Sequence, residues 1–219
     1  GAWGCEIPAT NGWNLTEMFE AMERDELKAV YCIGENPADS EADVKHARAM
    51  LERLDVLVVQ DVFLTRTAQM ADVVLPAALG WAESDGTVTN SERRVQRMRA
   101  AIPPPGEARQ EIGIINDLAA QMGDGGWGNP TAEELWEELR TVSPMHAGMS
   151  WERLETEGGI QWPCPTKDHP GSPFLHGRLW ERPAGGRLAP FSCVEDRRPL
   201  DELSDEFPLR LTTVRALDS

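Results

Sequence analysis

Apolar positions recur with two different periods along the first third of the chain. Residues 14–26 place apolar side chains at every third or fourth position, which predicts an amphipathic helix with Asn14 or Thr16 as its N-cap. Residues 27–34 are apolar almost throughout and end in a glycine, a pattern typical of a strand that is buried on both faces. The pattern therefore predicts a helix that leads into a buried strand.

The same alternation continues over the following residues. Residues 39–54 carry one apolar helical stripe, which Asp39 or Ser40 can cap. Helices between apolar strands imply right-handed crossovers and a parallel sheet. The remaining elements of this unit are a strand over 56–62, a short helix over 64–70, and a third strand over 71–75 that Pro76 stops.

A different pattern follows the third strand. Residues 87–90 and 93–99 flank a Ser91-Glu92 turn and predict a hairpin. The PPPG run at 103–106 is a stiff break and the best internal boundary. Beyond it we expect a helix over 107–122 closed by Gly123, a helix over 132–140 capped by Thr131, a loop-rich segment from about 143, and exposed tryptophans at Trp127, Trp136, Trp151, Trp162 and Trp180.

Together these elements predict an α/β fold. We expect a partial doubly wound (Rossmann-like), mostly parallel sheet with helices on both faces, followed by a helical and loop-rich segment. Residues 209–213 resemble the first strand of a further domain. We therefore expect the chain to be a piece of a longer protein.

Composition and charge exclude several classes of function. The 219 residues carry 21 Lys and Arg against 37 Asp and Glu, so the formal net charge is −16. Such an acidic chain repels phosphate backbones and anionic lipid, and no apolar run is long enough to span a membrane, so we expect no nucleic acid and no membrane span. The four cysteines lie far apart, which argues against a zinc ribbon, an iron–sulfur motif or a disulfide scaffold in this chain and suits a reducing, cytoplasmic setting.

Polar residues follow the first two predicted strands. In an open parallel sheet, ligands bind beyond the carboxyl ends of the strands, so side chains that follow neighbouring strands face one crevice. Carboxylates there can accept hydrogen bonds from ribose hydroxyls or from guanine, and carboxamides can donate or accept. The alternative is that the same residues only cap helices and make turns. The candidates are Gly34, Glu35 and Asn36 after the first strand and Gln60, Asp61 and Thr65 after the second.

Other candidate groups are weaker. Arg93, Arg94, Arg97 and Arg99 crowd one short strand and can bind either a pyrophosphate or nearby carboxylates. The histidines lack metal-ligand spacing, and Cys164 has no neighbouring base in the sequence and is interpreted as a buried cysteine. No catalytic triad, metal cluster or acid–base pair is evident, so we expect no catalytic and no metal-ligating residue in this chain.

Several longer strings resemble the molybdopterin oxidoreductase family, and within it the large catalytic subunit of bacterial formate dehydrogenases. The resemblance covers nearly the whole chain, and its second and third strings are specific. The strings are GENPADSEAD (34–43), LDVLVVQDVFLTRTAQMADVVLPAA (54–78), WAESDGTVTNSERRVQRMRAAIPPPGEAR (81–109), IQWPCP (160–165) and FPLRLTTVRALDS (207–219).

The resemblance implies a cofactor and a set of contacts. Members of the family hold two molybdopterin guanine dinucleotides (bis-MGD) around one molybdenum or tungsten atom, and two α/β domains each bind one guanosine end. The family's nucleotide contacts fall on the candidates above and also on Ser84 and Glu111. The Ser84 position varies in the family, and Glu111 replaces a common Asp.

The resemblance also implies a domain organisation. Residues 1–104 correspond to part of an MGD-binding α/β domain, residues 105–206 to a helical and irregular segment that packs on an N-terminal domain, and residues 207–219 to the start of a C-terminal cofactor-binding domain. The family's 4Fe-4S cluster and catalytic residues precede residue 1. We therefore expect this chain alone to be inactive, and its partners to be the rest of its own catalytic subunit and iron–sulfur or diaphorase-type electron-transfer subunits.

Three functions remain open. The first is a fragment of a formate dehydrogenase catalytic subunit, in which formate is oxidised to carbon dioxide. The second is the same family with another substrate, chiefly an assimilatory nitrate reductase. The third is a non-catalytic nucleotide-binding or assembly module. The residues that flank the metal distinguish the first two, and they are not in this chain.

Overall fold

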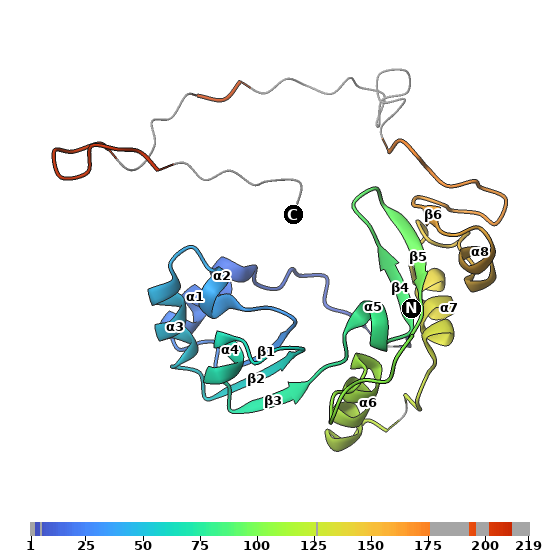
Figure 1. Ribbon diagram of the computed structural model, residues 1–219, viewed down its shortest axis with the longest axis horizontal. Coiled ribbons are helices and arrows are strands. Elements are labelled where there is room, and N and C mark those ends of the chain that lie inside the picture. The colour runs from blue at the N-terminus through green and yellow to red at the C-terminus, as the bar shows by residue number, and fades with distance from the viewer. Residues whose placement is uncertain (1–2, 5, 126, 176–192, 196–201, 212–219) are drawn as a thin grey trace. The chain divides into compact units, whose positions relative to one another are not determined.

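The computed structural model describes residues 3–4, 6–125, 127–175, 193–195 and 202–211 (Figure 1). Internal contacts divide the chain into two units, Gly1–Leu175 and His176–Ser219. In the second unit the described residues contain no helix or strand, so 209–211 do not form the predicted strand. The rest of that prediction, 212–213, lies outside the described residues.

A three-stranded parallel sheet organises the first part of the Gly1–Leu175 unit. Its order is β1-β2-β3, and both pairs are parallel, as predicted. Val59 of β2 lies opposite Cys32 of β1 and Val74 of β3. The α/β class and the parallel sheet are therefore confirmed. The bounds are β1 Ala29–Ile33, β2 Val56–Asp61 and β3 Val73–Pro76.

Four helices pack on one face of this sheet, as Figure 1 shows. Leu57 and Val59 alternate toward these helices and are fully buried, and Phe19 and Met22 from the first helix reach the same core. The predicted helix 14–26 is confirmed in a shorter form, and its cap Asn14 forms a capping box with Glu17. The helices are α1 Leu15–Glu23, α2 Pro37–Ser40, α3 Val44–Leu51 and α4 Arg66–Met70.

The predicted helix over 39–54 is wrong as a single element. The chain forms α2, bends, and starts α3 after a new N-cap, Asp43, whose side chain accepts from the His46 amide. The break has a tertiary cause. The Ala38 carbonyl, which would accept from the Ala42 amide in a continuous helix, accepts from Arg48 Nε at 2.8 Å.

The prediction that the first strand, over 27–34, is buried on both faces is also wrong. The face opposite α1–α4 carries Tyr31, Ile33, Val58 and Gln60, and Ile33 is 46 % exposed. Val73 on the same face of β3 is 45 % exposed. These strands are therefore apolar in sequence, although the helices α1–α4 cover only one face of the sheet.

An antiparallel sheet and four helices make up the remainder of the unit. The predicted hairpin is confirmed by β4 and β5, which pair antiparallel, and β6 adds to β5. The helix α8 and the strand β6 were not predicted. The elements are α5 Gly80–Glu83, β4 Gly86–Thr89, β5 Arg94–Met98, α6 Glu111–Gln121, α7 Ala132–Val142, α8 Trp151–Thr156 and β6 Ile160–Gln161.

The first of the two later helices starts later than predicted. Instead of beginning at 107, α6 begins at Glu111, because Arg109 bridges to the end of the parallel sheet. The Arg109 amide donates to the Pro76 carbonyl at 3.1 Å, and the Ala78 amide donates to the Arg109 carbonyl at 2.8 Å. The predicted helix 132–140 is confirmed by α7, with Thr131 as its cap.

A second core forms where α7, α8 and the hairpin meet. Val95, Trp136, Met149 and Leu154 are buried in it. The expected exposure is therefore wrong for Trp136, which is 6 % exposed. Trp151 and Trp162 are half-buried, Trp127 is exposed, and Trp180 lies outside the described residues.

Candidate functional site

The carboxyl ends of the parallel strands bring several candidate residues together. Gln60 lies in register with Ile33 of β1, the residue before Gly34. The Gly34 amide donates to the Gln60 carbonyl at 2.9 Å, and Gly34 has a positive φ of 64°, which a glycine adopts without strain. Asp61 follows directly and lies opposite Pro76 at the end of β3. Gly34, Gln60 and Asp61 thus share one edge of the sheet.

Glu35 and Asp61 lie around the thiol of Cys32. Burial raises the pKa of Cys32, and the negative charges of Glu35 and Asp61 act in the same direction. Glu35 is exposed and lines a cavity of about 390 Å³ beside α1. One oxygen of Asp61 accepts from the Phe63 amide at 3.0 Å. Both carboxylates therefore follow the carboxyl ends of neighbouring strands.

Asn36 and Thr65 have local structural roles. Asn36 Oδ1 accepts from the amide of Thr67 at 3.1 Å and from its hydroxyl at 2.8 Å, and Asn36 Nδ2 donates to Asp39. Thr65 Oγ1 accepts from the Ala68 amide at 3.2 Å and caps α4. The contacts of these two residues therefore agree with the alternative interpretation, in which residues that follow the strands cap helices and stabilise turns.

Gln60 differs because its side chain is buried and only half satisfied. It is 1 % exposed, on the sheet face opposite α1–α4. The hydroxyl of Tyr31 donates to Gln60 Oε1, whereas Gln60 Nε2 has no partner among the described residues. A buried donor without a partner costs about 1–3 kcal/mol, so Nε2 is a position where an added acceptor is strongly favoured.

The segments around Ser84 and Glu111 lie beside each other. Gln110 Nε2 donates to the Glu83 carbonyl at 3.1 Å, which ties the start of α6 to the residue before Ser84. Burial raises the pKa of Tyr31, and the negative charge of Glu111 acts in the same direction. Ser84 is 4 % exposed, and its Oγ lacks a partner within the described part of the chain. Ser84 and Glu111 thus lie on two segments that the Gln110–Glu83 hydrogen bond joins.

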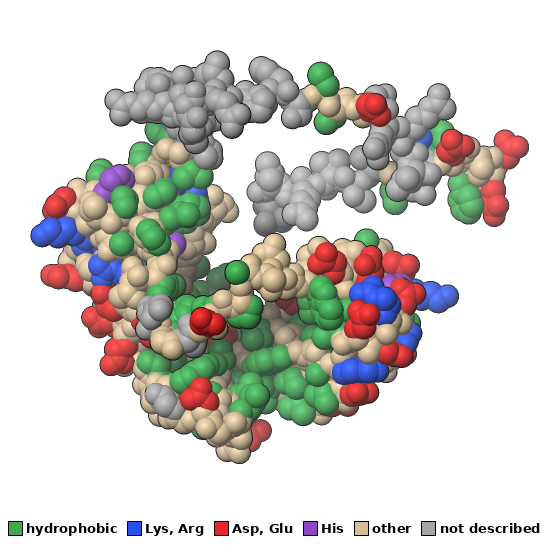
Figure 2. Space-filling model, turned by 180° about the vertical axis from the view of Figure 1, so that it is seen from behind, with side chains coloured by type: hydrophobic (Ala, Val, Ile, Leu, Met, Phe, Trp, Pro, Cys, Tyr) green, Lys and Arg blue, Asp and Glu red, His purple; other side chains and the backbone are tan. Residues whose placement is uncertain are grey.

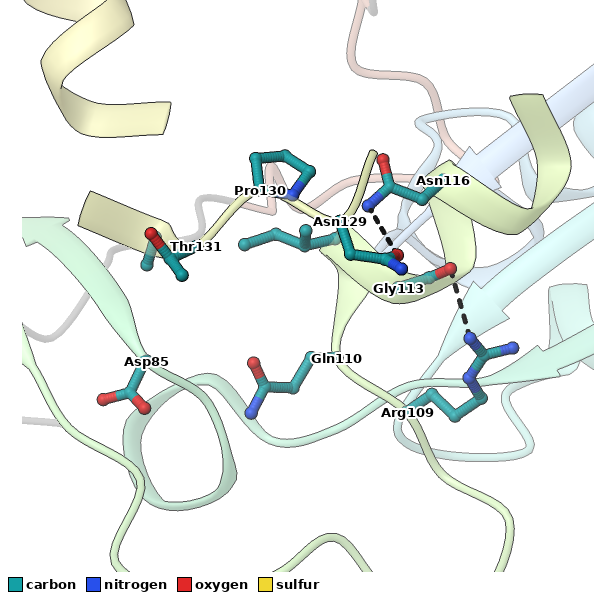
Figure 3. Close-up of a pocket in the computed structure, with 10 residues that line it drawn as sticks. Asp85, Arg109, Gln110, Gly113, Asn116, Asn129, Pro130 and Thr131 are labelled. Carbon is teal, nitrogen blue, oxygen red and sulfur yellow. Dashed lines mark hydrogen bonds between the residues drawn. The ribbon is translucent and has the colours of Figure 1, made fainter. Parts of the chain in front are cut away.

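A cavity of about 450 Å³ lies between the starts of α6 and α7 (Figure 3). The sequence reasoning missed it, because its walls come from two helix starts separated by a loop. Asn116 is 8 % exposed, and its Nδ2 makes one long bond of 3.4 Å to Asn129. Arg109 pairs with Asp117 at 2.7 Å, and the polar side chains of the walls alternate with the apolar Ile112, Pro130 and Ala132. Its lining residues include Asp85, Arg109, Gln110, Gly113, Asn116, Asn129 and Thr131.

The arginine cluster binds other parts of this chain. Arg93 Nη1 donates to the Trp162 carbonyl and Arg93 Nη2 to the Ser172 carbonyl, and its guanidinium lies 5.4 Å from the Trp162 ring centroid. Arg97, whose side chain is 10 % exposed, stacks on Trp151 at 3.4 Å. These contacts attach the irregular segment to the hairpin.

Two carboxylates pair with this cluster, Glu92 with Arg94 and Glu155 of α8 with Arg97 and Arg99. Arg97 Nε lies 3.3 Å from Glu155, and Arg99 also pairs with it. The hydrogen bond from Arg99 lowers the pKa of Glu155, and the charges of both arginines act in the same direction. The alternative of pairing with nearby carboxylates therefore describes these arginines, and their partners leave no vacant pyrophosphate cradle among the described residues.

Cys164 is fully buried, as expected, but a cation lies near it. Arg153 Nη1 lies 3.5 Å from Sγ, and the thiol donates to the His169 carbonyl at 3.2 Å. Burial lowers the pKa of His146, which shares a hydrogen bond of 2.7 Å with Ser143. In the described ranges, no group of three or more His, Cys, Asp or Glu side chains is arranged to hold a metal ion.

Comparison with protein families supports the resemblance. The model of the family described as molybdopterin oxidoreductase matches residues 4–121, more than half of the chain. The matched range includes all the strand-end residues, Ser84 and Glu111.

Individual proteins match over a longer range. The alpha subunit of F420-dependent formate dehydrogenase 2 from Methanococcus maripaludis is 47 % identical over 88 % of this chain and 28 % of its own length. The assimilatory nitrate reductase catalytic subunit of Bacillus subtilis is 36 % identical over 98 % of this chain and 31 % of its own length. The chain therefore spans about a third of the length of these relatives.

Among solved structures, acetylene hydratase from Pelobacter acetylenicus is similar over 67 % of this chain and 20 % of its own length. The TM-score is 0.51 and the sequence identity is 28 %. This similarity supports the same fold in both proteins.

Proposed function

Since the chain belongs to the molybdopterin oxidoreductase family, we propose that it binds the guanosine end of one molybdopterin guanine dinucleotide. The family implies a molybdenum– or tungsten–pterin cofactor. When bound, that cofactor supplies the redox chemistry, and the protein supplies binding, orientation and electrostatics. The proposed role of this chain is to help bind the cofactor, not to supply the redox chemistry.

One observation carries the proposal. Gln60 Nε2 is a buried donor without a partner at the carboxyl end of a parallel sheet, the place where open α/β sheets bind ligands. An acceptor on the ligand removes the cost of that unmade bond. The residues present therefore fit a nucleoside that offers an acceptor to the end of β2.

The neighbouring carboxylates complement the donors of guanosine. Guanine offers an N1–H and an amino group, and ribose offers hydroxyls. Glu35 is exposed, and Asp61 has an oxygen with no hydrogen-bond partner in the part of the chain that the structure describes. The Gly34 backbone is open, since an added Cβ would meet no atom within 4 Å. In this arrangement Asp61 and Glu35 accept from guanine or ribose, while Gly34 allows close approach.

Substitution of Asp61 tests this role in the full-length protein. Asp61→Asn keeps an acceptor for the Phe63 amide and removes the charge. A lost charge-assisted hydrogen bond is worth about 1.5–3 kcal/mol, so we expect a clear drop in the molybdenum or tungsten and pterin content of the purified variant. The matched control is Asp55→Asn, an exposed aspartate that precedes β2 at the opposite end of the same strand. Full cofactor occupancy in Asp61→Asn would show that this site does not bind the nucleotide.

For the whole protein we propose formate oxidation to carbon dioxide as the reaction. The support is the 47 % identity to a formate dehydrogenase alpha subunit, against 36 % to a nitrate reductase catalytic subunit. An assay of the full-length protein for formate oxidation with a viologen dye and for nitrate reduction tests the choice. Nitrate reduction without formate oxidation would reject formate as the substrate. The 4Fe-4S cluster and the electron-transfer partners are part of the same proposal.

A further inference from the structure

Gln60 is held by the one tyrosine of the chain. Tyr31 lies in the middle of β1, two residues before Ile33, the register partner of Gln60. Its hydroxyl donates a hydrogen bond to Gln60 Oε1. This orients the Gln60 carboxamide: its oxygen accepts a hydrogen bond from Tyr31, and its Nε2 hydrogens have no acceptor among the described residues.

The surroundings preserve this orientation. Burial and the negative charge of Glu111 both raise the pKa of Tyr31, so the phenol keeps its proton and remains a donor at neutral pH. The register neighbours of Gln60 on the two adjacent strands are Ile33 and Leu75, which have no polar side-chain atoms. An acceptor for Nε2 therefore has to come from outside these strands.

Resting on the proposed function above, we propose that Tyr31 is a positioning residue that sets the base specificity of the site. By fixing Gln60 Oε1, Tyr31 leaves Gln60 able only to donate to the ligand. Guanine presents a carbonyl, O6, at the position where adenine presents an amino group. A carboxamide that can only donate forms a hydrogen bond to guanine O6. With adenine, Gln60 Nε2 would face the amino group, so two donors would oppose each other, which is strongly disfavoured for buried polar groups.

Without the phenol hydroxyl the carboxamide is free to turn over. Its oxygen then faces the ligand as readily as its nitrogen, because the two ends of a carboxamide have nearly the same shape. Preference for a keto purine over an amino purine therefore depends on Tyr31, although Tyr31 itself need not touch the base. Gln60 is 1 % exposed in this structure, so contact between Nε2 and a base requires a local rearrangement.

The test compares three nucleotides with the full-length protein purified without cofactor. GMP and IMP both carry O6, whereas AMP carries an amino group. Calorimetric titration of the unsubstituted protein should give GMP and IMP binding at least about tenfold tighter than AMP, as expected from one gained hydrogen bond and one avoided clash of donors. In Tyr31→Phe, which keeps the ring and removes the hydroxyl, the GMP-to-AMP preference should fall by about fivefold or more.

A matched control removes a hydroxyl elsewhere. Thr89→Val changes an exposed residue of β4 and should leave the nucleotide preference unchanged. A GMP-to-AMP ratio in Tyr31→Phe equal to that of the unsubstituted protein would overturn the inference about Tyr31 while leaving the proposed function intact. Absence of any GMP binding by the unsubstituted protein would instead overturn both.

A second measurement needs no substitution. Because the chain has one tyrosine, ring-labelled tyrosine reports this site through the Tyr31 signal, assigned in the full-length protein by its loss in Tyr31→Phe or by a label confined to this chain. GMP and IMP should shift that signal, since they hydrogen-bond to the carboxamide that Tyr31 holds, and AMP should shift it less. GMP binding that leaves the Tyr31 signal in place would contradict the proposal even if Tyr31→Phe failed to fold.

Discussion

Single polar residues after a strand can have different roles that look alike in the sequence. Asn36 and Thr65 both satisfy backbone or hydroxyl groups of α4. Gln60 and Ser84 are instead buried with an unsatisfied atom each. The difference is in burial and partner geometry, which depend on the neighbouring strands and on the segment that leads into α6. The candidate site was therefore predicted as a set of residues but not as a set of contacts.

Gly148 illustrates a residue whose importance only the packing reveals. A Cβ built there would lie 2.1 Å from the Thr166 carbonyl oxygen and 2.7 Å from that of Cys164. Backbone atoms cannot move aside as a flexible side chain can, so we expect Gly148→Ala to lower the free energy of unfolding by about 2–3 kcal/mol.

The measurement is urea unfolding followed by tryptophan fluorescence. Gly12→Ala is the control, since an added Cβ there meets no atom within 4 Å. Equal unfolding midpoints for Gly148→Ala and Gly12→Ala would mean that the loop around Cys164 is not packed as described.

At the scale of elements, the sequence predicted which helices and strands form better than it predicted where they begin and end. The helices α1 and α7 begin where their caps Asn14 and Thr131 stand, because a capping box is a local interaction. By contrast, the break between α2 and α3 and the late start of α6 follow from hydrogen bonds to distant strands and helices. The short elements α8 and β6 carry too few residues for a periodic pattern.

The capping box of α7 gives a stability prediction. Thr131 Oγ1 accepts from the Glu134 amide at 3.2 Å, and the Glu134 carboxylate accepts from the Thr131 amide at 2.7 Å. Thr131→Ala should lower the free energy of unfolding by about 0.5–2 kcal/mol at neutral pH. Thr141→Ala, near the end of the same helix, is the control and should change stability by only a few tenths of a kcal/mol.

The effect of the Thr131 substitution should depend on pH. The backbone hydrogen bond from Thr131 lowers the pKa of Glu134 below its ordinary value of 4.5. A depressed carboxyl pKa contributes stability above the unfolded-state pKa, and this contribution is lost as the pH falls through the folded-state pKa. The gap between Thr131→Ala and the unsubstituted chain should therefore narrow in acid, and a gap that widens there would contradict the capping box.

At the scale of the whole molecule, the described residues leave many large apolar side chains on the surface. Figure 2 shows contiguous hydrophobic areas on one face. Phe63 and Trp81 are 74 % and 77 % exposed, and the partly exposed face of the parallel sheet adds Ile33 and Val73. No described helix has both the length and the apolar character to cross a membrane.

We expect the isolated 219-residue chain to be inactive. It spans about a third of the length of its relatives, and its proposed site binds only one nucleotide end. Supplied with cofactor, the chain should show neither formate oxidation with a viologen dye nor nitrate reduction. Turnover in either assay, with molybdenum bound stoichiometrically, would place a catalytic site within these residues and reject the proposal.

The sequence by itself determined the α/β class, the three parallel strands, the hairpin, the capped helices and the family. These depend on periodicity, on local capping and on long specific strings, all of which are properties of neighbouring residues. Only the tertiary structure decided that one sheet face is partly exposed, that the arginines hold the irregular segment, and that Tyr31 contacts Gln60. Each of these depends on which segments meet in space, and burial changes the free energy of a polar group by an amount that no local pattern encodes.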